Sequence, residues 1–313
     1  MGRTIFAIAI ILVTFRQASS FEVLREPTTA GGKSMLLWAG NPFGFWGGPF
    51  NQSKFEHFLN STMSLRDVVD TVSVPHFFLA DPSNATAVKI TGGLVPAENA
   101  ALITRELQKQ GFRVEPLIGN FYNTNQIARY RYYWGPGKAR FREACVTAVK
   151  TLGLDGLNFD FEPNDCSTDP QPCTESDAKA FSQLLSEVQS DLQGLGPHGT
   201  NARVSVDTGQ STIAKTPVLK ESAAELLITM NTYYGTSDFD IAIRRDIAND
   251  GADRFGLGVC PGCHLSSAED IEHRMGLAAE LGVRHIAWWS GADRNEAAHT
   301  DLWWDAIRKW KAA

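Results

Sequence analysis

The sequence has no run of lysine and arginine and no apolar segment long enough to cross a membrane. Its 313 residues include 29 basic and 35 acidic side chains, which gives a formal net charge of −6 at pH 7. Because no basic stretch could follow a phosphate backbone, we do not expect the chain to bind nucleic acid. A neutral or polar ligand fits this charge balance better.

Sequence motifs for metal ions and nucleotides are also missing. The seven histidines are scattered without an H-E-x-x-H spacing, and no G-x-G-x-x-G or phosphate-binding loop follows a predicted strand. Cys260-Pro-Gly-Cys263 has the spacing of a redox pair or half of a zinc site, but a second pair of matching spacing is absent. The sequence therefore indicates no metal site.

Cysteine is scarce, with five residues in the chain. An oxidising compartment would favour local disulfide bonds, one between Cys166 and Cys173 and one between Cys260 and Cys263. Cys145 is then left over. It falls in a helical pattern, so we expect a buried thiol there.

Residues 1–20 have the order of a secretory signal peptide. Arg3 precedes an apolar run over residues 5–13, and small residues follow before position 21. A buried N-terminal strand or a short membrane anchor is the alternative. Three Asn-x-Ser/Thr triplets, at Asn51, Asn60 and Asn84, add weak support for export. We expect a secreted protein, or one in the lumen of the endomembrane system or lysosome, with no membrane span once residues 1–20 are removed.

Short apolar runs alternate with longer amphipathic ones along the rest of the chain, which is typical of βα units. The predicted strands are Met35–Gly40, Val72–Leu79, Arg113–Gly119, Gly156–Glu162, Arg203–Thr208, Leu226–Tyr233, Phe255–Cys260 and His285–Ser290. Helical patterns include Ala97–Gln110, Lys138–Thr151, Ser176–Leu195, Ser267–Leu281 and Glu296–Lys311. Pro75 and Pro116 fall inside two of the strands, whose boundaries are therefore the least defined.

Eight alternating strands and helices predict an α/β fold, a single (β/α)8 TIM barrel over residues 21–313. A doubly wound open sheet is the alternative. In a barrel the active site lies at the carboxyl ends of the strands. The aromatic and glycine-rich residues 41–50 follow the first strand, and they could form a sugar platform at the mouth or a hydrophobic plug over the core.

The run Asp155-Gly-Leu-Asn-Phe-Asp-Phe-Glu162 carries the strongest chemical signal. Successive strand residues point to opposite faces, so its polar and apolar side chains separate. The polar side chains are Asn158, Asp160 and Glu162. Ionising neighbouring carboxyls in a desolvated site is unfavourable, and a carboxyl left protonated can act as a general acid. Glu162, nearest the mouth, is the expected acid, and an edge strand with a solvated acidic face is the alternative.

This run resembles the D-G-x-D-x-D-x-E strand of glycoside hydrolase family 18. Asn158 stands where most family members have the first inward aspartate, although the di-N-acetylchitobiase branch also has asparagine there. The departure bears on proton sharing along the row and leaves the acid in place.

Other strands resemble the family's motifs in the same order. Leu117-Ile-Gly-Asn120 is similar to the third-strand S-x-G-G, and Asn231-Thr-Tyr-Tyr234 to the sixth-strand M-x-Y-D, with Tyr234 in place of the aspartate. Ala287-Trp-Trp-Ser290 is similar to the terminal tryptophan strand. Here Trp289 is the better match for the residue beneath the sugar, and one of its two tryptophans is expected to pack in the barrel. Further candidate substrate-binding residues are Asn158, Asn231 and Trp38.

The resemblance implies hydrolysis of β-1,4 bonds next to N-acetylglucosamine, with retention and with the sugar's own acetamido group as nucleophile. Glu162 would protonate the leaving oxygen, Asp160 and Tyr233 would hold the acetamido group, and Trp289 would stack beneath the ring. No metal or organic cofactor is implied.

Two questions stay open at this point. The chain could be a non-catalytic chitinase-like lectin, although such proteins usually lose the terminal glutamate. The substrate could be chitin, chitooligosaccharides or the chitobiose core of N-glycans. Pro261–Arg284 has room for one helix only, so we expect no large insertion domain, a shallow cleft and short or terminally bound substrates. We expect the chain to be a monomer.

Overall fold

The computed structural model describes the sheet, the helices around it and part of the connecting chain. The described residues are 32–38, 51–74, 77–78, 97–119, 126–161, 173–208, 217–233, 238–261, 263, 267–289 and 300–313. Predictions for residues 1–20, residues 41–50 and Glu162 lie outside this set.

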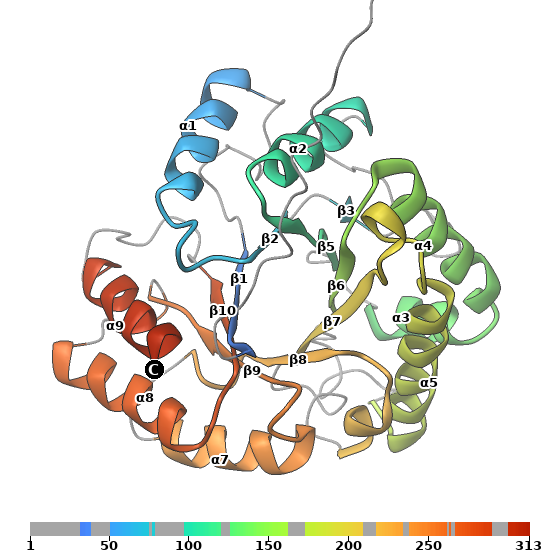
Figure 1. The fold of residues 1–313 in the computed structure, drawn as a ribbon. Coiled ribbons are helices and arrows are strands. Elements are labelled where there is room, and N and C mark those ends of the chain that lie inside the picture. Colours follow the sequence, from blue (N-terminus) through green and yellow to red (C-terminus); the bar gives the residue numbers. More distant parts are fainter. Residues whose placement is uncertain are drawn as a thin grey trace, which may run out of the picture.

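Ten strand segments of the described residues form one parallel sheet. They are β1 (Ser34–Trp38), β2 (Thr71–Ser73), β3 (Phe77–Phe78), β4 (Arg113–Val114), β5 (Leu117–Gly119), β6 (Gly156–Asp160), β7 (Arg203–Thr208), β8 (Leu226–Thr229), β9 (Phe255–Val259) and β10 (His285–Trp289). Their order is β3-β5-β6-β7-β8-β9-β10-β1-β2-β4. Figure 1 shows β1, in blue, beside β10, in red, at the centre of a ring of helices.

The sheet closes on itself because β2 with β3, and β4 with β5, are consecutive pieces of two neighbouring strands. β2 pairs with β4 and β3 pairs with β5, so the strand that contains β2 and β3 runs beside the strand that contains β4 and β5, and the barrel is closed. Between these pieces the Glu115 N–H donates to the Val72 carbonyl and the Leu117 N–H to the Val74 carbonyl, both at 3.1 Å. Pro116, which has no N–H, falls between β4 and β5.

The helices alternate with the strands and cover the outside of the barrel (Figure 1). Those of the described residues are α1 (Gln52–Met63), α2 (Ala97–Lys109), α3 (Gln126–Trp134), α4 (Lys138–Leu152), α5 (Glu175–Asp191), α7 (Phe239–Asp250), α8 (Ala268–Glu280) and α9 (Thr300–Ala312), with short 3₁₀ turns at Pro197–Gly199 and Pro217–Glu221. The prediction of a single (β/α)8 TIM barrel is confirmed, and the open doubly wound sheet is wrong. Between β9 and β10 the described residues contain α8 and no other helix, in agreement with the absence of a large insertion.

Local sequence explains where α5 begins and ends. Thr174 caps its first turn in a capping box with Asp177, whose carboxylate also accepts two bonds from Arg131 at 2.8 Å. The helix ends at Asp191, before the predicted Leu195. Gly194 has a positive φ of 69°, a conformation that a helix cannot continue through.

Strand alternation divides the apolar side chains into two groups. Between the strands and the helices, Phe161 stacks on Tyr130 with ring centroids 4.4 Å apart, and Trp288 stacks on Trp304 at 4.2 Å. Inside the barrel is a smaller cluster that includes Trp38 and Ile228. This smaller cluster leaves room in the interior for the polar row on β6.

The cysteines follow their predicted arrangement where it can be seen. Cys260 and Cys263 form a disulfide bond, as predicted. Cys173 is also disulfide-bonded, and its predicted partner Cys166 lies outside the described residues. Cys145 is a free, buried thiol, and burial raises its pKa. Among the described residues no group of histidine, cysteine and acidic side chains supports the zinc alternative for the Cys260 pair.

Asp250 is a buried carboxyl and the last residue of α7. This end of the helix lies near the amino ends of the strands, because β9 begins a few residues later. Burial raises its pKa to about 7, and the nearby charge of Asp246 adds to the shift. Between about pH 4 and pH 7 the folded chain therefore binds more protons than the unfolded chain, so this group's contribution to stability is lost as the pH rises through that window.

We expect Asp250→Asn to remove this loss. Relative to the native chain, the free energy of unfolding of the variant should rise between pH 4 and pH 8, by up to about 4 kcal/mol. Urea unfolding of both proteins across this range measures the difference. Parallel pH profiles would show that Asp250 titrates normally.

Candidate active site

Strand β6 carries the acidic row into the barrel interior. Phe159 packs in the outer core, so the alternating Asn158 and Asp160 face inward. Asn158 is fully buried and Asp160 is 5% exposed. Glu162 follows directly after Phe161, the last described residue of this segment, and its role stays a prediction.

Asn158 is held by hydrogen bonds to side chains on two other strands, β1 and β7. Its Oδ1 accepts from the indole N–H of Trp38, across the barrel on β1, at 2.8 Å. Its Nδ2 donates to Asp207 Oδ1 at 2.8 Å and to Ser205 Oγ at 3.0 Å, both on β7. The indole N–H can only donate, so it must face Oδ1, and the amide nitrogen is left to donate to Asp207 and Ser205. An amide at position 158 can accept from Trp38 and donate to Asp207 at once, which an ionised aspartate at this position could not do.

Asp207 is a site residue that the sequence analysis missed. It is 5% exposed, and in the register of β6 and β7 it lies opposite Asp160. The run Arg203-Val-Ser-Val-Asp207 has the same alternation as β6, with a polar side chain at every second position. That alternation was the available signal for a second inward polar row.

A buried ion pair lies deeper in the barrel than the acidic row. Arg203 Nε donates to Glu115 Oε1 at 2.8 Å, and Ser205 Oγ donates to Glu115 Oε2 at 3.1 Å. Glu115 is fully buried. His285, on β10, has its pKa lowered by burial and by the positive charge of Arg203. The buried charges of Glu115 and Arg203 are therefore paired in the part of the interior that lies toward the amino ends of the strands.

Three aromatic side chains from different strands or turns meet near the carboxyl ends of the barrel strands. Trp38, on β1, contacts Tyr233 and Trp289 edge to face, with ring centroids 6.5 and 6.3 Å away. Trp38 and Tyr233 are 2% and 7% exposed, whereas Trp289 is half-buried. The neighbouring Trp288 packs instead against helix α9. Of Trp38, Tyr233 and Trp289, Trp289 is therefore the most accessible to solvent.

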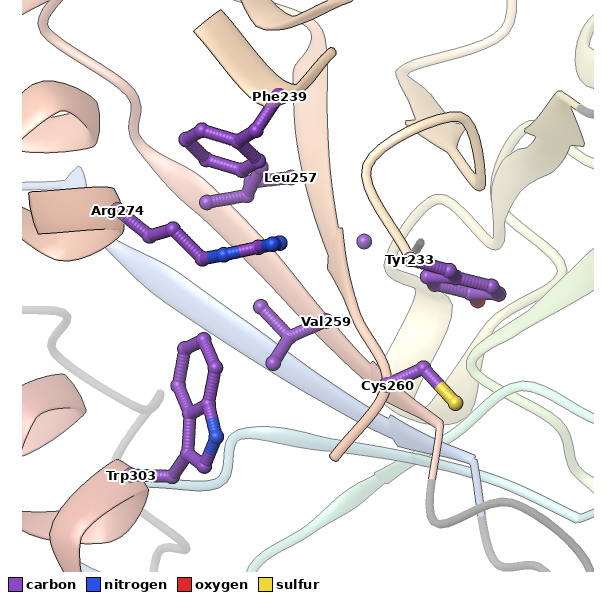
Figure 2. Close-up of a pocket in the computed structure, with 8 residues that line it drawn as sticks. Tyr233, Phe239, Leu257, Val259, Cys260, Arg274 and Trp303 are labelled. Atoms are coloured by element: carbon purple, nitrogen blue, oxygen red, sulfur yellow. The ribbon is translucent and has the colours of Figure 1, made fainter. Parts of the chain in front are cut away.

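Helix α8 fixes the turn that carries Tyr233. Arg274, which is buried, donates to the Thr232 carbonyl at 3.0 Å and to Asp270 at 3.0 Å. Its guanidinium carbon lies 4.5 Å from the ring centre of Phe239. Figure 2 shows this side chain extending from α8 toward β9, with Tyr233 at the other side of the pocket. The position of Tyr233 thus depends on a charged helix residue.

Gly258 on β9 lets this turn come close to the sheet. The Thr232 hydroxyl donates to the Gly258 carbonyl at 2.7 Å. A Cβ atom at Gly258 would lie 2.7 Å from Cε1 of Tyr233, which is too close for any side chain.

The pocket of Figure 2 lies on the helix side of Tyr233 and has room for about one water molecule. It is too small for a sugar ring, so it does not represent a substrate cleft. Among the described residues no group of histidine, cysteine and acidic side chains could hold a metal ion. No described helix is long and apolar enough to span a bilayer.

The predicted residue Asn231 is placed apart from the interior row. Its Nδ2 donates to Asp246 Oδ2, on helix α7, at 3.0 Å, and Thr229 Oγ1 donates to the same oxygen at 2.6 Å. The structure therefore brings together Asn158, Asp160, Trp38, Tyr233 and Trp289, whereas the Asn231 amide points to the helix layer.

Comparison with known proteins identifies the fold and leaves the sequence family open. No protein-family model matches the sequence, and a search of curated proteins finds no match. Solved structures of similar fold are chitinases of glycoside hydrolase family 18 and related glycoside hydrolases, at 7% to 14% identity.

Three of these structures show the extent of the similarity. A chitinase from Chromobacterium violaceum is 12% identical, with a TM-score of 0.65 over 90% of this chain and 99% of the other. The Group IV chitinase of Ostrinia furnacalis is 11% identical, with a TM-score of 0.62 over 90% and 100%. A family 18 N-acetylglucosaminidase from Paenibacillus barengoltzii is 12% identical, with a TM-score of 0.60 over 89% and 99%. The chain has the barrel fold of these glycoside hydrolases over almost its whole length.

Proposed function

We propose that the chain is a retaining glycoside hydrolase that cleaves β-1,4 bonds next to N-acetylglucosamine. The observation that supports this most strongly is the inward row of Asn158 and Asp160, which leads to Glu162 and lies beside Trp38, Tyr233 and Trp289. Carboxyls and aromatic rings at the carboxyl ends of barrel strands form a site that suits a sugar.

In the proposed reaction Glu162 donates a proton to the oxygen of the bond that breaks. The acetamido oxygen of the sugar attacks the anomeric carbon, so no side chain becomes the nucleophile, and the ring that forms is an oxazolinium ion. Asp160 stabilises this ion, and the Tyr233 hydroxyl donates a hydrogen bond to the acetamido oxygen before it attacks. Water then attacks the anomeric carbon, and Glu162 takes a proton from that water.

The burial of the described groups suits this division of roles. Asp160 is nearly buried, so its charge acts in a medium of low dielectric constant, where it stabilises a cation more strongly than in water. The half-buried Trp289 offers an accessible ring face for the apolar side of a pyranose. Trp38 is more deeply buried and bonded to Asn158, so it supports the floor beneath the sugar.

The proposal includes export of the chain and a substrate bound by one end. Disulfide bonds such as Cys260–Cys263 persist in oxidising compartments. Two of the three glycosylation triplets, at Asn51 and Asn60, are exposed at the start of α1 and on its surface. Because the described residues between β9 and β10 hold the single helix α8, we propose a shallow cleft, which favours chitooligosaccharides or the chitobiose core of an N-glycan over crystalline chitin.

Incubation with fluorogenic N-acetylglucosamine oligomers tests the proposed activity. We expect release of the fluorophore, with a product profile on unlabelled oligomers that shows short or terminal cleavage. Isothermal titration with the same oligomers measures binding in parallel. Binding without turnover would overturn the enzyme and identify a lectin.

A further inference from the structure

We infer that Asp207 supplies the second carboxyl of the site and shares one proton with Asp160 across strands β6 and β7. This inference rests on the proposed function, because it makes Asp207 a positioning residue for Asp160. Asp207 on β7 would then supply the carboxyl that the resembled family has at the position of Asn158.

The two carboxyls are neighbours inside the barrel. Asp160 and Asp207 are register partners on adjacent parallel strands, which lie about 4.8 Å apart. Asn158 bonds to Asp207 and shares a face with Asp160, so both carboxyls point into the interior. Each is 5% exposed.

Two negative charges on neighbouring side chains in a buried interior repel strongly, and one shared proton removes most of that repulsion. Arg203, at the start of β7, is bonded to Glu115. As positive charge develops on the acetamido-derived ring, Asp160 can ionise while Asp207 keeps the proton.

The amide at position 158 is what allows a carboxyl on β7. Asn158 Nδ2 donates to Asp207 Oδ1 at 2.8 Å, while its Oδ1 accepts from Trp38. A carboxylate at position 158 would place an oxygen against an oxygen of Asp207. The asparagine therefore belongs with Asp207, and the two residues form an exchanged pair.

An exchange of the two side chains tests this pairing. Asp207→Asn removes the second carboxyl, and we expect kcat to fall by about 100-fold or more. KM should change by less than about 3-fold, because in this proposal Asp207 acts through Asp160 and not on the sugar itself. The double variant Asn158→Asp/Asp207→Asn returns the carboxyl to β6 with an amide opposite it, and it should regain at least about 10-fold in kcat over Asp207→Asn. Asp250→Asn, a buried carboxyl at the other end of the barrel, should keep the native kcat.

A folded Asp207→Asn variant with native kcat would overturn the inference. So would a folded double variant that is no more active than Asp207→Asn. Thermal unfolding identifies the folded variants.

Infrared difference spectroscopy tests the shared proton without any variant at Asp207. Near pH 6, subtracting the spectrum of Asp160→Asn from that of the native chain should show the carbonyl stretch of one protonated carboxyl. A difference that contains only a carboxylate stretch would overturn the shared proton. Because this spectrum does not depend on turnover, a native chain that hydrolyses no substrate would overturn the proposed function alone.

Discussion

Glu162→Gln is expected to lower kcat on N-acetylglucosamine oligomers by about 10²- to 10⁴-fold. Glutamine keeps the shape of the side chain and its hydrogen bonding but has no proton to give to the leaving oxygen. The same group takes a proton from water in the second step, so both halves of the reaction should slow. Binding should persist, because the aromatic group and Asp160 are unchanged.

The measurement is steady-state turnover of a fluorogenic oligomer, with oligomer binding followed by calorimetry. Glu175→Gln provides the matched control, because Glu175 is exposed and pairs with Lys179 on the surface of α5. It should turn over substrate at the native rate. Undiminished hydrolysis by Glu162→Gln would remove Glu162 from the mechanism.

Glu115→Ala is expected to lower the free energy of unfolding by about 3–5 kcal/mol. The change leaves the guanidinium of Arg203 buried without its carboxylate, and it removes the acceptor of Ser205. Arg113, whose Nε lies 3.8 Å from Glu115, loses a partner as well. Urea unfolding monitored by tryptophan fluorescence measures the loss.

A paired substitution separates the ion pair from general packing. Glu115→Met/Arg203→Met removes both charges and keeps most of the volume, so it should recover much of the stability lost in Glu115→Ala. If Glu115→Ala unfolds at the native urea concentration, the ion pair does not stabilise the barrel.

The interior row on β6 could be predicted because it depends only on strand alternation. The period of two residues places Asn158 and Asp160 on the face opposite Phe159 without any knowledge of the neighbours. The barrel could be predicted from the spacing of the apolar runs. The Cys260–Cys263 disulfide bond could be predicted because the two cysteines are three residues apart.

The partners across strands could not be predicted in the same way. Asp207 lies 49 residues from Asn158, and Glu115 lies 88 residues from Arg203. Alternation says that such side chains face inward, but only the register says which of them meet. Glu115 also precedes Pro116, which reads in the sequence as an interruption of a strand.

The placement of Asn231 shows a related limit. Tyr233, two residues later, contacts Trp38. The chain turns after β8 ends at Thr229, so strand alternation does not predict which way Asn231 and Tyr233 point. The Asn231 amide bonds to Asp246 on α7, and Arg274 on α8 holds the turn by the Thr232 carbonyl. Both contacts come from helices later in the chain.

The most direct test of the proposed chemistry is the configuration of the first product. Proton nuclear magnetic resonance of native chain with a chitooligosaccharide, recorded before the product equilibrates, distinguishes the two anomers. Retention through the acetamido group predicts that the β-anomer appears first. Initial release of the α-anomer, or an oligomer that is bound and left uncleaved, would contradict the account.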